Sequence, residues 1–250
     1  REAAAQALGR LGEASAPHAA ELAALLKDRD SRVPLKAALA LSRVGQAATG
    51  HLELLERLSQ EDGMETKRVY FDMSAQIIRA TLKVCADMAA AADGQAAANA
   101  CADIVQGGSR AEVVAAARSL ARLGESAASH APTLAACLED GRCKVKKGDG
   151  IKDSITKMVV REEVADAISR LGAAAAKVAR RALKKLAAQG LDENAANRAL
   201  RRLERAAKQR GRSSTPASPA APSGRALSTS GPSPPAAGAA VPSLQAPSAS

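Results

Sequence analysis

Three histidines are the first residues of this sequence that could support metal binding or catalysis. His18, His51 and His130 each lie ten residues after an apolar residue of a recurring motif, and each is followed four residues later by a leucine. They therefore occupy one position of a repeated unit. Stacked helices lie roughly 8–10 Å apart, so one histidine per unit cannot close around a zinc ion with ligands at about 2.1 Å. We expect structural histidines that begin the second helix of each unit, pack on its leucines and bond a neighbouring turn.

The four cysteines give no metal or redox motif. Cys85, Cys101, Cys137 and Cys143 form no CxxC pair, and no histidine lies at zinc-ligand spacing from them. The first three fall in helical apolar patterns, where a free cysteine behaves as a small hydrophobic residue. Free cysteines are typical of reducing compartments, so we predict an intracellular, cytoplasmic protein. The chain begins at Arg1 inside a helical pattern, and we expect it to be a fragment whose true N-terminus is missing.

Other enzyme motifs are absent from the sequence. It contains no GxxxxGK[ST] phosphate loop, no GxGxxG and no GxSxG. Acidic residues such as Asp28, Glu61 and Asp140 recur near the ends of the expected second helices, where we interpret them as solvated repeat features rather than a paired acid and base. We therefore expect no catalytic residues, no metal site and no cofactor.

An internal repeat organises these positions. The segment EAAAQALGRLG at 2–12 returns in altered form at 36–45, 114–124 and 163–172. Equivalent apolar residues, which we call the phase residues, are Leu8, Leu41, Ile77, Leu120, Ile168 and Leu200. Apolar residues recur at three and four positions, as in helices and unlike strands. Gly12, Gly45, Gly124 and Gly172 follow the motif, and glycine is the residue that most readily ends a helix.

Each unit continues into a second helix, expected within 16–28, 50–62 and 129–140. The third unit, around 64–106, departs from the pattern and contains one lengthened helix. Tyr70 and Phe71 are the only aromatic residues and tryptophan is absent, so alanine and aliphatic residues must form the core between closely packed helices. The sequence thus predicts an all-α protein, an α-solenoid of about five to six helix-turn-helix units. No segment is apolar enough to predict a transmembrane helix.

These motifs resemble those of the HEAT family. The similarity rests on EAAAQALGRLGEASAPHAAELAALLKDRDSRV at 2–33 and its weaker copies, and covers roughly residues 1–210. It is closest to the short, alanine-rich HEAT-like repeats of phycobilisome-lyase-like proteins. The resemblance implies an α-solenoid, but HEAT arrays serve many tasks, and no residue here can be identified with a bilin-lyase activity.

One enzyme built from HEAT-like repeats, deoxyhypusine hydroxylase, also resembles this chain in its alanine-rich helices. That family holds iron through His-Glu pairs at helix starts. The matching positions here are Arg1-Glu2 and Arg161-Glu162, and the sequence contains no His-Glu dipeptide. The iron ligands are missing, so we exclude that activity.

The net charge of +10 is concentrated near the end of the repeats. Residues 1–176 contain 23 basic and 23 acidic residues, whereas 177–212 contain 12 basic and 3 acidic residues. We expect this region to be a basic terminal helix pair, whose candidate binding residues are Lys177, Arg180, Arg181, Lys184, Lys185, Arg198, Arg201, Arg202, Arg205 and Lys208. In its last helix the arginines share one face opposite Ala196, Leu200, Leu203 and Ala207. We predict that this basic face points outward.

Two further segments differ from the repeats. Residues 141–159 form a predicted basic loop insertion, which contains the candidate binding residues Lys144, Lys146 and Lys147, and a loop of this length is either functional or disordered. Residues 213–250 consist mostly of Ser, Ala and Pro. Such a composition cannot bury enough apolar surface to fold, so we predict a disordered tail.

Two functions fit this sequence. The first is a non-catalytic protein–protein interaction scaffold, in which stacked helix pairs present a curved surface to a protein or peptide. The alternative is binding of a polyanion, either RNA or DNA phosphates or an acidic partner, through the basic terminal helices. Interleaved aromatics are absent, which argues against recognition by base stacking. A basic terminal helix can also serve only as a solubilising cap.

Overall fold

The structure is a computed structural model that describes residues 1–141, 143, 148–188 and 193–213, without the side chains of 193–195, 207 and 209–213. The chain divides into two units, Arg1–Ser214 and Thr215–Ser250. The predicted tail, apart from Ser213, and the loop residues Lys144, Lys146 and Lys147 lie outside the described residues. Within the described part of the chain every regular element is a helix, which confirms the all-α prediction.

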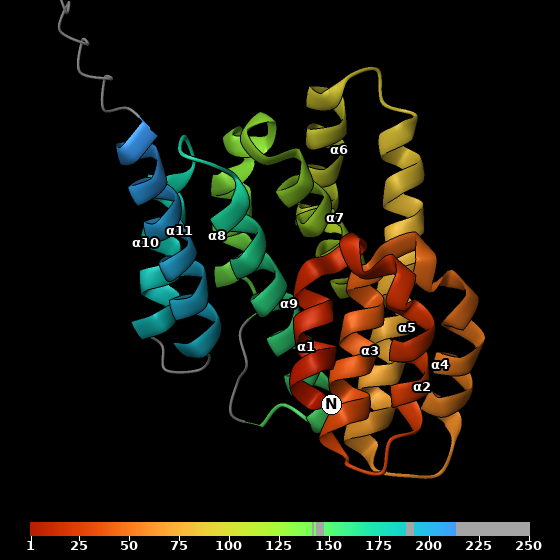
Figure 1. Cartoon of the computed structure of the whole chain (residues 1–250). Coiled ribbons are helices and arrows are strands. Elements are labelled where there is room, and N and C mark those ends of the chain that lie inside the picture. Colours follow the sequence, from red (N-terminus) through yellow and green to blue (C-terminus); the bar gives the residue numbers. More distant parts are fainter. Residues whose placement is uncertain (142, 144–147, 189–192, 214–250) are drawn as a thin grey trace, which may run out of the picture. The chain divides into compact units, whose positions relative to one another are not determined.

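The compact part Arg1–Ser214 contains eleven described α-helices and four 3-10 helices. Figure 1 shows how the α-helices are arranged. In chain order they are α1 (Glu2–Leu11), η1 (Gly12–His18), α2 (Ala19–Ala24), η2 (Leu25–Lys27), α3 (Arg32–Val44), η3 (Gly45–His51), α4 (Leu52–Gln60), α5 (Glu65–Ala89), α6 (Gly94–Gly107), α7 (Arg110–Leu123), η4 (Gly124–His130), α8 (Ala131–Glu139), α9 (Ile151–Arg170), α10 (Ala176–Ala188) and α11 (Glu193–Ser213).

The same connection joins two helices at three places. It begins where α1, α3 and α7 end, at Gly12, Gly45 and Gly124, whose φ angles are 60°, 79° and 59°. Side chains other than glycine rarely adopt these angles, so the repeated glycines end their helices as predicted. Gly172 follows α9 with a φ of 84°. The regular return of glycine after the motif therefore has a backbone cause, because it ends the first helix of each of these units.

Each connection is a seven-residue 3-10 helix that ends at a histidine. Three residues after the glycine, Ser15, Ala48 and Ala127 are fully buried. Only a small side chain suits this position, and the Ser15 hydroxyl donates to the Gly12 carbonyl at 2.7 Å. His18, His51 and His130 directly precede α2, α4 and α8, so their predicted place at the start of the second helices is confirmed.

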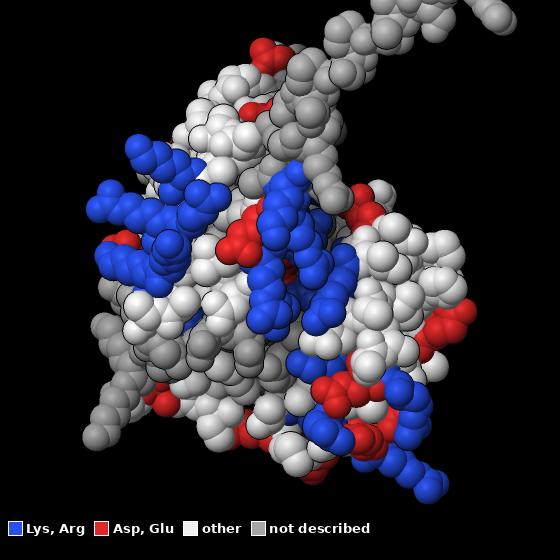
Figure 2. Space-filling view, turned by 60° about the vertical axis from the view of Figure 1, so that its left-hand side comes forward, with Lys and Arg blue, Asp and Glu red and all other residues white. Residues whose placement is uncertain are grey.

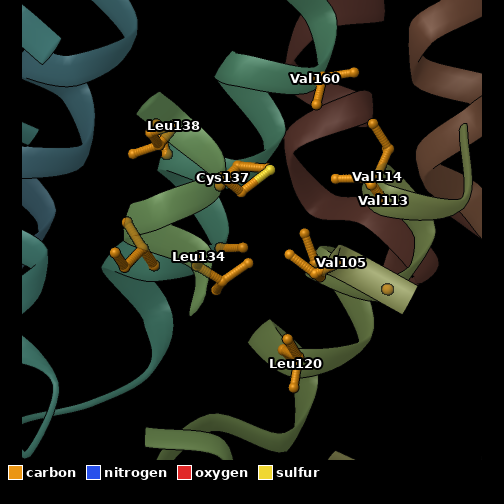
Figure 3. Close-up of a cluster of buried hydrophobic side chains, with 14 of the residues drawn as sticks. Val105, Val113, Val114, Leu120, Leu134, Cys137, Leu138 and Val160 are labelled. Atoms are coloured by element: carbon orange, nitrogen blue, oxygen red, sulfur yellow. The ribbon is translucent and has the colours of Figure 1, made fainter. Parts of the chain in front are cut away.

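The first helices of successive units pack on one another along the chain: α1 on α3, α3 on α5, α5 on α7, α7 on α9 and α9 on α11. The phase residues of α3, α5, α7 and α9 lie on these contacts and are completely buried, whereas Leu8 and Leu200 are partly buried against the core. Figure 3 shows part of this core, in which Val105 of α6, Leu120 of α7 and Leu134 and Cys137 of α8 lie in one buried cluster. The core is therefore aliphatic, as the composition predicts.

Two segments depart from the regular unit. Helix α5 spans 25 residues, which confirms a lengthened helix in the third unit. The predicted loop 141–159 is wrong in its second half, because α9 already begins at Ile151. Ile155, Val159 and Val160 are buried, and this apolar spacing of four and one places them on the side of α9 that packs on its neighbours.

Candidate functional site

A charged cavity of about 330 Å³ lies among the described residues. It lies between α1 with η1 on one side and α9 with α11 on the other, and α3 and α7 contribute its remaining walls. Its charged lining consists of Arg10, Arg43, Arg118, Arg122, Arg170, Arg198 and Arg202 with Glu13, Glu162, Glu163 and Asp166. Seven guanidinium groups thus face four carboxylates, which leaves an excess of positive charge.

Five of the seven arginines come from one position of the repeat. An arginine lies two residues after every phase residue, namely Arg10, Arg43, Arg79, Arg122, Arg170 and Arg202. All of these except Arg79 line the cavity; Arg79 instead pairs with Glu56 of α4. Of these arginines only Arg202 was a predicted binding residue, although the regular spacing of all six from the phase residues is visible in the sequence. Five of these six equivalent arginines therefore line one cavity.

A buried triad forms the deepest part of the charged lining. Glu163 of α9 is 5% exposed and lies between Arg43 and Arg118, which are 19% and 16% exposed. Arg43 Nε donates to Glu163 Oε1 at 2.7 Å and Arg118 Nε donates to Oε2 at 2.9 Å. Arg118 Nη2 also donates to the Ser42 hydroxyl at 3.3 Å. The triad connects α3, α7 and α9, although they are distant in sequence.

The pKa values in the triad follow from these contacts. Burial alone raises the pKa of Glu163, but the positive charges and hydrogen bonds of Arg118 and Arg43 outweigh it and hold that pKa far below its ordinary range. Burial lowers the pKa of Arg43, and the charges of Glu163 and Glu162 more than reverse this effect. Glu163 and Arg43 are therefore both charged at neutral pH.

Two arginines of the basic face of α11, Arg198 and Arg202, pair with carboxylates of α9 while their side chains stay 45% and 42% exposed. Arg198 Nη2 donates to Glu162 Oε1 at 2.9 Å, and Arg202 pairs with Asp166. Both pairs join residues 36 positions apart. The carboxylates and the arginines are each spaced four residues apart, so an acidic stripe of α9 matches one edge of the basic face of α11.

The α1 side of the cavity has fewer carboxylates. Arg122 of α7 pairs with Glu13 of η1 and donates to Ser119 at 3.0 Å and to the Cys85 thiol at 3.4 Å. Arg10 is exposed and makes no ion pair with a described residue. On the opposite wall, Arg170 Nε lies 2.8 Å from Asp166 Oδ2. The positive charge without a carboxylate on the same wall thus lies on α3 and α7, which contribute Arg43, Arg118 and Arg122.

A second basic region lies on the outside, and we call it the outer basic face. It consists of the exposed residues Lys177, Arg180, Arg181, Lys184 and Lys185 of α10 with Arg201, Arg205 and Lys208 of α11. Figure 2 shows Lys and Arg gathered over the side formed by α10 and α11. Lys185 Nζ lies 2.8 Å from Glu139 Oε2, and α10 itself contains no acidic residue. These eight predicted residues are exposed, as the sequence indicates.

Lys152 and Lys157, which were predicted to lie in a loop, lie in α9 and pair with carboxylates. Lys152 Nζ lies 3.2 Å from Asp72 Oδ2, and the nearly buried Lys157 lies 2.9 Å from Asp149 Oδ2. Lys157 also pairs with Asp153. Both positive charges therefore serve contacts between helices or cap the start of α9.

The three histidines lie apart from one another, each at the start of a different helix. His18 lies 3.7 Å from Glu21, and His130 Nε2 lies 3.5 Å from the Gln95 amide. Cys101, Cys137 and Cys143 are buried, and Cys137 Sγ lies 3.7 Å from Cys143 Sγ without a disulfide bond; burial raises the pKa of Cys101 to about 11. Among the described residues no cluster of three or more His, Cys, Asp or Glu could hold a metal ion. Within the same residues no helix could cross a membrane.

Comparison with protein-family models, with curated proteins and with solved structures gave no match for this chain. The resemblance to HEAT repeats thus stays a prediction from the sequence. The cavity is defined by its own geometry and charge.

Proposed function

We propose that this chain is a non-catalytic scaffold of the HEAT-like α-solenoid type that binds a protein partner on the face formed by its first helices. The observation that supports this proposal best is the repeated arginine. Five arginines at the same position of the repeat, one each from α1, α3, α7, α9 and α11, line the charged cavity. No single helix pair could form this surface, which is typical of stacked repeats that bind through a shared concave side.

The charge of this face favours an acidic partner surface. Seven arginines against four carboxylates leave positive charge at the cavity, and charge complementarity directs association and excludes partners of like charge. Leu11 lies at the cavity and is 61% exposed, so it adds an apolar contact beside the charges. A mixed apolar and arginine-rich surface is the composition that protein interfaces favour.

Site-specific photo-crosslinking tests this proposal. A photoreactive phenylalanine analogue replaces Leu11 at the cavity or, as a matched control, Met64, which is 56% exposed and lies outside the cavity lining. The proposal expects a discrete crosslinked adduct from position 11 in cells that produce the protein, and none from position 64. Equal adducts from both positions, or adducts from position 64 alone, would contradict it.

The outer basic face supports a second candidate function, which is binding of the phosphate backbone of a nucleic acid. The observation in its favour is that five exposed cations of α10 have no acidic neighbour on their own helix. A filter-binding series with duplex RNA and DNA at rising salt tests it. Neutralising Lys177, Arg180, Arg181 and Lys184 together must weaken binding and flatten its salt dependence. Binding that is absent from the wild type at low salt contradicts it.

The design of this test depends on the structure. A charge reversal of Arg198, Arg201, Arg202 and Arg205 would combine two exposed residues with two that pair with α9. Loss of binding in such a variant could then reflect a disturbed cavity. The four substitutions in α10 avoid this ambiguity because all four side chains are exposed.

A further inference from the structure

The hydrogen-bonding groups of the cavity are unbalanced. Both oxygens of Glu163 accept from arginines, Glu162 Oε1 lies close to both Arg43 and Arg198, and the two oxygens of Asp166 contact Arg170 and Arg202. These acceptors are thus in use. A guanidinium carries five N–H donors and no acceptor. With seven arginines in the lining, donors outnumber the acceptors that the protein provides.

The cavity also separates two parts of the fold. Helix α1 packs on α3 but makes no extensive contact with α9 or α11, although all three contribute residues to the lining. Arg10 lies on the α1 wall, while Arg170 and Arg202 lie on the opposite wall. A ligand in this space would therefore contact arginines of the first unit and of the last two units together.

We propose that this cavity is a binding site for a compact anion that carries two or more phosphate groups. Each phosphate brings several acceptor oxygens and negative charge in a small volume, and arginine binds it through two parallel hydrogen bonds. The volume of about 330 Å³ lies at the lower end of the range for small-molecule sites. Arg10 is the principal ligand, because it makes no ion pair with a described residue, and Arg122 and Arg170, which each pair with one carboxylate, complete the set.

The lining selects against two other kinds of ligand. A peptide main chain would bring N–H donors into a cavity whose carboxylates already accept from arginines, and buried donors without acceptors are costly. A nucleotide base would need a flat partner, but the sequence has only Tyr70 and Phe71 as aromatics and neither lines the cavity. Gly9, Gly12 and Ala199 instead leave room beside the guanidinium groups.

This inference does not rest on the scaffold proposal, because anion binding needs no protein partner. Isothermal titration of the whole chain with sodium tripolyphosphate in 150 mM salt measures it directly, with pyrophosphate, orthophosphate and citrate as comparison ligands. We expect one tripolyphosphate per chain, weaker binding of pyrophosphate, and still weaker binding of orthophosphate and citrate. Bound tripolyphosphate must also raise the thermal unfolding temperature, since it binds the folded state.

Two matched variants locate the site. Arg10→Ala with Arg170→Ala removes two charges from opposite walls and must weaken tripolyphosphate binding at least tenfold. Arg181→Ala with Lys184→Ala removes two charges from the outer basic face and must change it less than twofold. Both variants are checked for helicity and unfolding temperature, and Arg10→Ala alone, at an exposed residue without an ion pair, keeps the test valid if the double variant is unstable.

Three results would overturn the proposal. They are the absence of binding to the wild type at millimolar tripolyphosphate, equal weakening by the two double variants, and citrate binding as tight as that of tripolyphosphate. None of these results bears on the crosslink from position 11. Failure of the anion site and failure of the scaffold are therefore separate outcomes.

Discussion

The cavity and the outer basic face carry the same kind of charge in different surroundings. In the cavity, carboxylates from α9 each contact two arginines, and the triad around Glu163 is almost removed from solvent. On α10, five cations are exposed and no carboxylate lies on the same helix. Positive charge in the cavity therefore supports the fold as well as a ligand, whereas positive charge on α10 contributes to solubility and long-range attraction.

The largest expected effect is that of removing the central carboxylate of the cavity. Glu163→Gln keeps the shape of the side chain but removes the carboxylate that pairs with Arg118 and leaves the mostly buried Arg43 with only Glu162, at 3.5 Å. We expect the free energy of unfolding to fall by about 3–5 kcal/mol, measured by urea denaturation. Glu53→Gln is the control, because Glu53 is exposed on α4, and it should change stability by less than about 0.5 kcal/mol. Equal effects would mean that the triad is not a stabilising contact.

The pH dependence of stability should show the same carboxylate. The pKa of Glu163 is held far below the ordinary value of 4.5 in the folded protein. As the pH falls, Glu163 is therefore protonated in the unfolded chain at a higher pH than in the folded protein. The stabilisation from Glu163 is complete above pH 4.5 and is lost as the pH falls toward the folded-state pKa, by about 1.4 kcal/mol per pH unit. Urea denaturation between pH 5 and 3 should show a shallower slope in Glu163→Gln than in the wild type. Parallel slopes would assign the acid sensitivity to other groups.

Ion pairs at the edge of the cavity should be weaker than the triad but stronger than those outside. A double-mutant cycle of Arg202→Gln and Asp166→Asn should give a coupling of about 0.5–1 kcal/mol, since both side chains are about 40% exposed. The cycle of Lys185→Gln and Glu139→Gln, whose side chains are 58% and 48% exposed, should give about 0.3 kcal/mol or less. A larger coupling outside than inside would remove the energetic distinction between the two regions.

The smallest effect is expected on the outer basic face itself. Neutralising Lys177, Arg180, Arg181 and Lys184 together should alter the free energy of unfolding by no more than about 0.5 kcal/mol, because none of them makes a described ion pair. A slight gain in stability is equally consistent, since like charges on adjacent turns repel. A loss of several kcal/mol would show that α10 depends on its cations for folding.

The sequence was sufficient for features that depend on neighbouring residues. Helix ends at Gly12, Gly45 and Gly124 follow from the backbone angles that glycine permits, and buried phase residues follow from helical periodicity. The start of α9 was predicted too late, because a basic, glycine-containing segment resembles a loop. In the structure the first turns of α9 pack on the core through the buried residues Ile155 and Val160. The repeated arginine was visible in the sequence, but its role was not.

Local periodicity, composition and glycine placement therefore determined an all-helical protein of repeated helix pairs with one strongly basic end. Only the tertiary structure decided which charges meet. Glu163 pairs with Arg43 across 120 residues, and Arg198 and Arg202 pair with carboxylates of α9. Such contacts depend on how helices far apart in the sequence pack together, and residues of α1, α9 and α11 line one cavity although no single segment of the sequence contains them all.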